Sequence, residues 1–187
     1  MFLTRITLHN IKRYKAPITI DLQNRSLINT ISGKNGSGKS TIFESILLVQ
    51  KAFFADLLEP NGVLNLDFLA NGQPTRRERV AREFAALASN REASISATFC
   101  FTKDDLAGIG VGVSQDNNNV TLTLSGTNII GTACEWTINT NTEEEKAILS
   151  YFWNLDNPTN IIVMLSADKN VYEDDFGYEK INLHHLL

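Results

Sequence analysis

One short stretch limits what this 187-residue chain can fold into more than any other. Residues 33–40 read Gly-Lys-Asn-Gly-Ser-Gly-Lys-Ser and fit the pattern G-x-x-x-x-G-K-[S/T] at every fixed position. An apolar run, 27–31, precedes the glycines, and a helical spacing of apolar residues begins at Ser40. A glycine-rich loop that joins a strand to a helix predicts a P-loop NTPase and an α/β fold.

The chemistry of this loop follows from its residue types. Glycines let successive backbone N–H groups point into one concavity, and the start of the following helix adds free N–H groups and a positive dipole end. Lys39 is then placed to reach the β- and γ-phosphates as the catalytic lysine, Ser40 to ligate Mg²⁺, and Thr41 to meet the α-phosphate. The sequence predicts ATP and Mg²⁺ as ligands of a cradle built from Gly33, Lys34, Asn35, Gly36, Ser37, Gly38, Lys39, Ser40 and Thr41.

Hydrophobic periodicity predicts mixed secondary structure around the loop. Alternation predicts strands at 2–8, 18–22, 27–31, 93–101, 120–124 and 136–139, and an unbroken apolar run predicts a buried strand at 161–165. Helical spacing predicts helices over 40–57, 75–89 and 142–156, and 61–74 is expected to be a loop. The spacing of Thr75 with Glu78 and of Thr142 with Glu145 predicts a capping box at the start of each later helix.

Composition narrows the class of protein. No apolar run approaches the roughly 18 residues that a membrane span needs, and the amino terminus lacks the apolar block of a signal peptide. Cys100 and Cys134 match no metal-binding spacing, and we interpret them as buried thiols of a cytoplasmic protein. Residues 1–41 carry seven basic residues and one acid, whereas the rest carries ten basic and twenty acidic residues. This asymmetry indicates an anionic ligand near the amino-terminal end.

The interior of the loop suggests a family. GKNGSGKST at 33–41, following an amino-terminal hairpin, resembles the ABC-type ATPase heads of structural-maintenance-of-chromosomes (SMC) proteins, of the RecF and RecN repair proteins, and of related anti-phage ATPases. The opening ITLHNIKRYKAPITIDL is similar to theirs, with Ile11 at the family's aromatic position. The resemblance implies that Lys12 or Arg13 approaches the nucleotide or DNA. It is strong over 1–50 and looser over 93–165.

The resemblance also implies a domain organisation. Residues 1–187 would form the amino-terminal lobe of such a head, with an antiparallel hairpin and strand group around the P-loop helix, a variable insert at 51–92, and the second lobe absent from this chain. The implied partners are a second ATPase head, either a homodimer partner or the missing carboxy-terminal lobe, and DNA; no membrane is expected. The implied function is an ATPase that couples ATP-driven head dimerisation to DNA binding in repair, maintenance or anti-phage defence.

A complete head needs further parts that the sequence does not supply clearly. Leu124-Ser125-Gly126 imitates the family's serine-glycine signature, but the residues that follow predict a loop and a strand rather than a helix. Asp168 imitates a catalytic carboxylate, yet it lies three residues beyond the apolar run 161–165, and no Gln follows residue 115. We therefore expect the chain alone to bind ATP but hydrolyse it negligibly. A P-loop nucleotide or small-molecule kinase and a non-hydrolysing ATP-binding module remain alternatives.

A second basic group lies outside the loop. Five arginines fall on or near the helix expected at 75–89: Arg76, Arg77, Arg79, Arg82 and Arg91. Such a face could follow DNA phosphates. The alternative is a solvated face whose arginines pair with Glu78, Glu83 and Glu92, and the sequence leaves both open.

Overall fold

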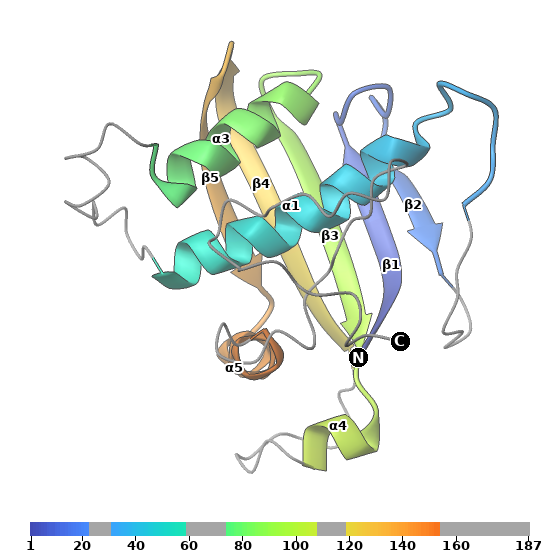
Figure 1. The fold of residues 1–187 in the computed structure, drawn as a ribbon, viewed down its shortest axis with the longest axis vertical. Helices are drawn as coiled ribbons and strands as arrows, with labels where there is room; N and C mark the ends of the chain where they lie inside the picture. Colours follow the sequence, from blue (N-terminus) through green and yellow to red (C-terminus); the bar gives the residue numbers. More distant parts are fainter. Residues whose placement is uncertain (23–30, 59–73, 108–118, 154–187) are drawn as a thin grey trace, which may run out of the picture.

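The structure, a computed structural model, describes residues 1–22, 31–58, 74–107 and 119–153 (Figure 1). Five antiparallel strands form one sheet in the order β2-β1-β3-β4-β5. Their bounds are Phe2–His9 (β1), Ile18–Asp21 (β2), Ala93–Cys100 (β3), Asn119–Ile130 (β4) and Ala133–Thr140 (β5). Neighbours in sequence are neighbours in space except where β1 pairs with β3, so the first strand lies inside the sheet.

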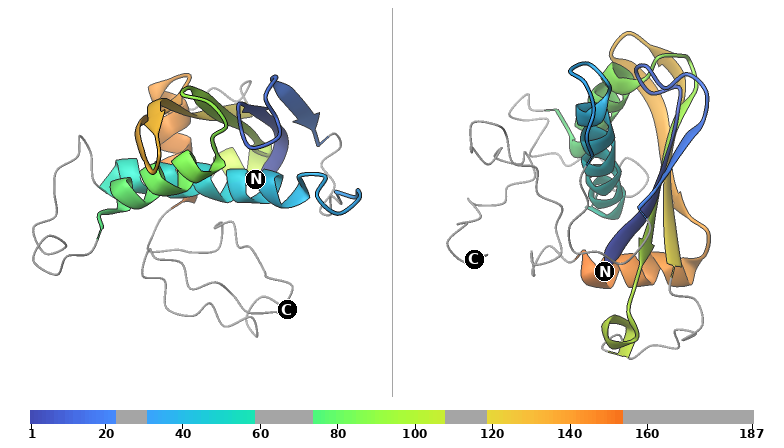
Figure 2. Two further views of the ribbon diagram at one scale, coloured as in Figure 1. Left: turned by 90° about the horizontal axis from the view of Figure 1, so that it is seen from above. Right: turned by 90° about the vertical axis from the view of Figure 1, so that its right-hand side faces the viewer.

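Helices cover one face of this sheet. The long helix α1, Lys39–Leu58, lies across the strands, and α3, Arg76–Leu87, packs beside it. Figure 2 shows the sheet from its edge, with α1 and α3 together on one side. The shorter helices α4, Lys103–Ala107, and α5, Glu143–Phe152, lie at the end of the sheet where β3 and β5 finish. The prediction of an antiparallel strand group around the P-loop helix is confirmed.

The two faces of the sheet follow from strict alternation. In β3 every second residue is buried under the helices, and the residues between them are half-buried on the opposite face. Hydroxyl groups pair across the strands on that opposite face: Ser96 Oγ lies 2.9 Å from Thr123 Oγ1, and Thr98 Oγ1 lies 3.0 Å from Thr121 Oγ1. Small hydroxyl residues fit a pleated surface of which only one side enters the core.

Aromatic side chains fill the space between α1 and the sheet. Trp153 is fully buried, with its ring centroid 5.3 Å from that of Phe53 and 5.2 Å from that of Phe99, both in edge-on geometry. Such pairs add about 0.5–1.5 kcal/mol beyond the burial of their area. This cluster joins α1, β3 and the end of α5, and it holds the far half of the P-loop helix on the sheet.

The helix α1 is apolar on more than its sheet-facing side. Its buried residues recur at nearly every turn from Thr41 to Ala55. On the remaining surface Phe43 is 46% exposed, and Leu57 and Leu58 are each 39% exposed. A helix that is apolar around most of its circumference is typical of a position between two layers.

Residues 51–92, expected to be a variable insert, contribute to the core where they are described. Ala52, Phe53 and Phe54 continue α1 inside the core, and Val80 and Phe84 bring α3 into it. The described part of this segment is therefore packed into the domain. Variation of the segment within the family stays a prediction.

A close approach of α3 to β4 explains the glycine of the stretch Leu124-Ser125-Gly126. Gly126 faces α3, and a Cβ atom there would overlap the ring of Phe84, which is fully buried. Both Ser125 and Gly126 lie within β4, so the prediction that Leu124-Ser125-Gly126 does not start a helix is confirmed. The glycine has a packing role.

The capping predictions have different outcomes. Thr75 and Glu78 form the reciprocal capping box of α3. At α5, Thr142 accepts from the Glu145 N–H at 3.2 Å, but the Glu145 carboxylate does not return to Thr142. It accepts instead from the backbone N–H groups of Asn141, at 3.1 Å, and of Thr121, at 3.3 Å. The second capping box is thus wrong in its return bond, because the buried Glu145 carboxylate binds N–H groups of Asn141, after β5, and of Thr121, in β4.

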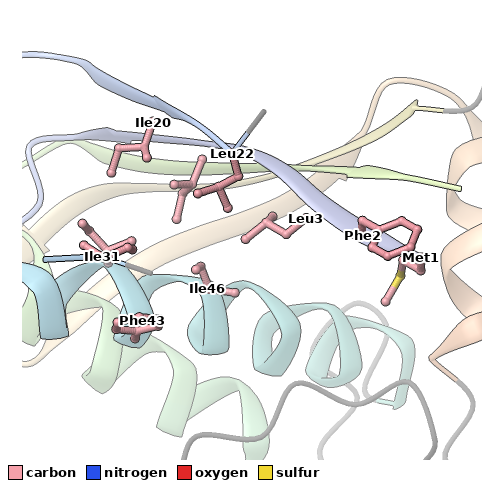
Figure 3. Close-up of a pocket in the computed structure, with 10 residues that line it drawn as sticks. Met1, Phe2, Leu3, Ile20, Leu22, Ile31, Phe43 and Ile46 are labelled. Carbon is pink, nitrogen blue, oxygen red and sulfur yellow. The ribbon is translucent and has the colours of Figure 1, made fainter. Parts of the chain in front are cut away.

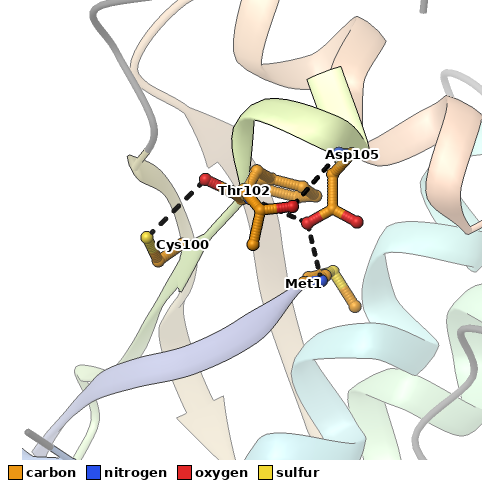
Figure 4. A network of polar contacts seen from close by, with 5 residues as sticks. Met1, Cys100, Thr102 and Asp105 are labelled. Carbon is orange, nitrogen blue, oxygen red and sulfur yellow. Dashed lines mark hydrogen bonds and ion pairs between the residues drawn. The ribbon is translucent and has the colours of Figure 1, made fainter. Parts of the chain in front are cut away.

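The short helix α4 was not expected from the sequence, and a polar network starts it (Figure 4). Thr102 Oγ1 accepts from the Asp105 N–H at 3.1 Å, while Asp105 accepts from the Thr102 N–H at 2.8 Å and from the Met1 amino group at 3.0 Å. Burial acts to raise the pKa of the Asp105 carboxyl group, but the bonds from Thr102 and the amino group outweigh it and hold this pKa below its usual value.

Several other expectations can be compared with the described ranges. Strand β4 runs six residues past the expected end at 124, and strand β5 begins before the expected 136. Cys100 and Cys134 are free, as expected, but they are half-buried rather than fully buried. Partial burial still raises the pKa of the Cys134 thiol. The strand expected at 27–31, apart from Ile31, the loop at 61–73, the strand at 161–165 and Asp168 lie outside the described residues. Within the described ranges, no helix is both long and apolar enough to cross a membrane.

Candidate nucleotide-binding site

The glycine-rich loop curls as the sequence predicts and leads directly into α1. The Ser37 N–H donates to the Lys34 carbonyl at 3.1 Å, which closes a turn over residues 34–37. Gly36 and Gly38 have φ angles of 76° and 94°, a region that side chains with a Cβ rarely adopt. Helix α1 then begins at Lys39. Its first N–H groups have no partner within the helix.

These residues surround one open cavity of about 510 Å³. That volume lies within the range of about 300–1,000 Å³ that is usual for small-molecule sites. Nine of the eleven residues predicted to bind the cofactor line it: Lys12, Arg13, Asn35, Gly36, Ser37, Gly38, Lys39, Ser40 and Thr41. The structure therefore brings the turn after β1 and the phosphate loop to the same opening.

The other two predicted residues act through their backbone. The Lys39 ammonium group donates to the Gly33 carbonyl at 2.6 Å and to the Lys34 carbonyl at 2.9 Å, and it lies 3.4 Å from Ser37 Oγ. The lysine thus caps the carbonyl groups of its own loop. A phosphate oxygen would be a stronger, charged acceptor than these neutral carbonyls, so an incoming phosphate chain can take over contacts that Lys39 makes here.

The two hydroxyl residues after Lys39 differ in exposure. Ser40 is exposed at the opening, whereas Thr41 is 6% exposed and its carbonyl accepts from Ser45 Oγ at 2.7 Å. A hydroxyl that ligates a nucleotide-bound metal must be accessible, and Ser40 meets this condition. The buried position of Thr41 fits a role in starting α1 as well as the predicted contact with phosphate.

Lys12 is held at the edge of the opening by an ion pair. Its ammonium group lies 2.7 Å from a Glu44 carboxylate oxygen on α1, with both side chains more than a third exposed. An exposed pair of this kind stabilises little, about 0–1 kcal/mol. Lys12 can therefore exchange Glu44 for an anionic ligand at small cost.

Arg13 and Tyr14 reach the loop from the same turn. The Arg13 guanidinium donates to the Gly36 carbonyl, and the Tyr14 hydroxyl lies 3.4 Å from the Ser37 carbonyl. Tyr14 was missed in the sequence analysis. The one available signal was a single aromatic residue inside the charged turn 12–15.

The cavity is basic and contains no described carboxylate in its lining. Lys12, Arg13 and Lys39 supply three positive charges, and Glu44 is the acid that pairs with Lys12. Such a site suits a polyanion. Water activation for phosphoryl transfer also needs a group that orients the water, and the described lining offers none. The described lining supplies groups that suit the binding of a phosphate chain.

The arginine group on α3 is partly engaged inside the domain. Arg77 lies 3.0 Å from an Asp56 carboxylate oxygen, and its guanidinium stacks over Trp136 at 4.1 Å from the ring centroid. The predicted partner Glu83 binds Lys51 instead, at 3.1 Å. The structure therefore gives Arg77 and Glu83 partners on α1, Asp56 and Lys51.

A second pocket lies between the first half of α1 and the strands β1 and β2 (Figure 3). Its volume is about 300 Å³, and all the residues that line it have apolar side chains: Met1, Phe2, Leu3, Ile6, Ile20, Leu22, Ile31, Ile42, Phe43 and Ile46. It shares no residue with the basic cavity. The first two turns of α1 thus contribute to both, with Lys39, Ser40 and Thr41 at the basic cavity and Ile42, Phe43 and Ile46 at the apolar pocket.

Comparison with known proteins gives one match over nearly the whole chain. The sequence model of the AAA ATPase domain family matches residues 1–185. A search of curated proteins finds no match.

The solved structures that are similar to the chain include two from work on SMC proteins. One comes from work on ATP-driven dimerization and DNA-stimulated activation of SMC ATPases; it is 17% identical, with a TM-score of 0.47 over 80% of this chain and 78% of that chain. The other is an SMC head bound to the C-winged helix domain of ScpA, 17% identical, with a TM-score of 0.41 over 80% of this chain and 40% of that chain. The family match covers both the phosphate loop and the five-stranded sheet, and the chain belongs to the AAA ATPase domain family.

Proposed function

We propose that the chain is the ATP-binding part of an SMC- or RecF-like ATPase. The observation that carries the proposal is the basic cavity of about 510 Å³ at the amino terminus of α1, with Lys39 at its centre. Backbone N–H groups at a helix start, together with several cations and no described carboxylate in the lining, are the features expected of a triphosphate site.

The residues present fit ATP with Mg²⁺. Backbone groups of 36–39 would cradle the phosphates, Lys39 would neutralise the β- and γ-phosphates, and Ser40 would ligate the metal. Lys12 and Arg13 lie at the opening, where they can meet a nucleotide or a DNA phosphate. When bound, ATP supplies a hydrolysable phosphoanhydride; the chain supplies binding and orientation.

We further propose that a second structural unit covers α1. The exposed side chains of Phe43, Leu57 and Leu58 support a partner layer on the side of α1 away from the sheet. A second ATPase lobe or head fits this position. Coupling of ATP-driven head association to DNA binding, in repair, maintenance or anti-phage defence within the cytoplasm, belongs to the same proposal.

A non-hydrolysing ATP-binding module is the second candidate. It is favoured by the absence of any Asp or Glu from the described lining of the cavity. In that case ATP would serve to hold two units together, and turnover would stay low after assembly. Both candidates share the phosphate site and differ in what the partner contributes.

The metal assignment predicts a specific effect of Ser40→Ala. Since Ser40 offers one hydroxyl oxygen to a cation that needs near-octahedral oxygen ligands, the variant should lose most of the gain in ATP affinity that Mg²⁺ gives the wild type. Affinity in EDTA should hardly change. Calorimetric titration with and without Mg²⁺ measures both, and Ser32→Ala, an exposed serine outside the cavity lining, is the control. An unchanged Mg²⁺ gain in Ser40→Ala would remove Ser40 from the metal site.

The proposal also predicts the activity of residues 1–187 alone. Phosphoryl transfer depends on positioning and electrostatic stabilisation, and the described cavity provides only the cradle. Phosphate release by the chain should therefore be negligible at low concentration, and it should rise with a supplied second lobe, with protein concentration or with DNA. Rapid hydrolysis independent of concentration, and lost in Asp168→Ala, would contradict the split-site account.

A further inference from the structure

The turn between β1 and β2 is anchored to the carboxyl end of α3. Ile11 is fully buried and forms a bridge with Ala88. On either side of it, the Lys12 N–H donates to the Leu87 carbonyl at 2.6 Å, and the Ser89 N–H donates to the Asn10 carbonyl at 2.7 Å. The turn therefore has a fixed base on the domain.

The following residues of this turn contact the phosphate loop, Arg13 at the edge of the cavity and Tyr14 away from its lining. The Arg13 guanidinium donates to the Gly36 carbonyl, and the Tyr14 hydroxyl faces the Ser37 carbonyl at 3.4 Å. The tyrosine is half-buried and does not line the basic cavity. Its contact with the loop is thus separate from any contact with a bound nucleotide.

These contacts fix the orientation of two peptide groups. A trans peptide is planar, with its C=O and N–H pointing in opposite directions. When the Ser37 carbonyl turns toward Tyr14, the Gly38 N–H must point away from Tyr14. Arg13 holds the preceding peptide, between Gly36 and Ser37, in the same way. Both peptides belong to the part of the loop that lines the cavity.

We propose that Arg13 and Tyr14 are positioning residues that hold the phosphate loop in its binding geometry through the Gly36 and Ser37 carbonyls. This inference rests on the proposed nucleotide site, whose loop Arg13 and Tyr14 would hold in place. Arg13 thereby acts on the nucleotide through the loop, in addition to any direct contact at the opening.

The fit around Gly38 agrees with this role. A Cβ atom on Gly38 would lie 2.5 Å from the Tyr14 hydroxyl oxygen and 2.9 Å from Arg13 Cδ. Atoms of the turn thus occupy the space directly behind the loop. The support is a close contact with the backbone at the position where α1 begins.

A comparison of ADP with ATP distinguishes two roles for Arg13 and Tyr14: holding the phosphate loop in place, and contacting the γ-phosphate directly. The loop N–H groups hold the phosphates that ADP and ATP share. Loss of the support should therefore weaken ADP and ATP by the same factor. Loss of a direct contact with the γ-phosphate would weaken ATP alone.

The test compares Tyr14→Phe, Arg13→Ala and the double variant with the wild type, by titration with ADP and with ATP. Tyr14→Phe keeps the ring and removes only the hydroxyl, so it should weaken both nucleotides by roughly two- to fivefold, the lower part of the range for one hydrogen bond. The double variant should weaken both by roughly tenfold or more. Tyr151→Phe, a 53% exposed tyrosine on α5, is the matched control.

A spectroscopic signature separates positioning from general destabilisation. The backbone amide resonance of Gly38 should shift in nucleotide-free Tyr14→Phe and stay in place in Tyr151→Phe, while the unfolding midpoint stays close to that of the wild type. Wild-type affinity of the double variant for ADP, or a loss confined to ATP, would overturn the inference. The Lys39→Ala variant distinguishes failure of this inference from failure of the proposed nucleotide site. If Lys39→Ala binds ATP as well as the wild type, the nucleotide site itself is wrong. If Lys39→Ala loses binding but the Arg13 and Tyr14 variants keep it, only the positioning role of Arg13 and Tyr14 is wrong.

Discussion

Replacing Lys39 with alanine should weaken ATP binding by roughly ten- to a hundredfold. A charge-assisted contact contributes about 1.5–3 kcal/mol, and Lys39 is the cation at the centre of the loop. The free energy of unfolding should change little, because the Gly33 and Lys34 carbonyls that Lys39 now caps are exposed and can bind water. Calorimetric titration and chemical denaturation measure the two effects.

The matched control for this substitution is Lys15→Ala. Lys15 is exposed on the neighbouring turn and does not line the cavity, so its loss changes the net charge equally. Because salt screens the effect of a distant exposed charge, the ATP affinity of Lys15→Ala should stay within about twofold of that of the wild type. Equal losses in both variants would indicate that net charge rather than Lys39 governs binding.

Replacing Gly38 with alanine should reduce ATP affinity by roughly a hundredfold or more. The φ angle of 94° is strained for any residue with a Cβ atom, at about 1–3 kcal/mol. The new Cβ would also meet Tyr14 and Arg13 at 2.5 and 2.9 Å, so the loop or the turn must move. Since Gly38 directly precedes α1, this movement displaces the N–H groups that would face the phosphates.

Comparison with Gly36→Ala separates the backbone strain of a positive φ angle from the contact of a new Cβ atom with Tyr14 and Arg13. Gly36 also has a positive φ angle, 76°, but a Cβ there meets no atom within 4 Å. The control variant carries the backbone strain alone and should lose clearly less affinity than Gly38→Ala. If both variants lose equal affinity, the close contact with the turn contributes nothing, and titration of the two proteins side by side decides this.

The parts that were predictable from the sequence are those determined locally. The phosphate loop needs glycine at 36 and 38 and a helix start at 39, and both requirements are readable from residue types and spacing. Alternation identified β1 and β3, and the spacing of Thr75 with Glu78 identified the start of α3. These features depend on neighbours within a few residues.

The parts that were missed depend on distant partners. Glu145 leaves the expected capping bond because the N–H of Thr121, 24 residues away, lies beside it. Helix α4 is five residues long, too short for a periodic pattern, and Asp105 at its start is also bound by the Met1 amino group. Tyr14 reaches Ser37 only after the sheet has folded the turn back onto the loop. Such contacts have no local signature.

The most direct measurement of the central claim is a calorimetric titration of MgATP into the nucleotide-free chain, repeated in the presence of pyrophosphate and of adenosine. The account predicts saturable binding with one ATP per chain. Pyrophosphate should compete strongly, because the loop and Lys39 hold phosphate groups, and adenosine should compete weakly. Absence of saturable ATP binding, or competition by adenosine but not by pyrophosphate, would contradict the assignment of residues 33–41 as a phosphate cradle.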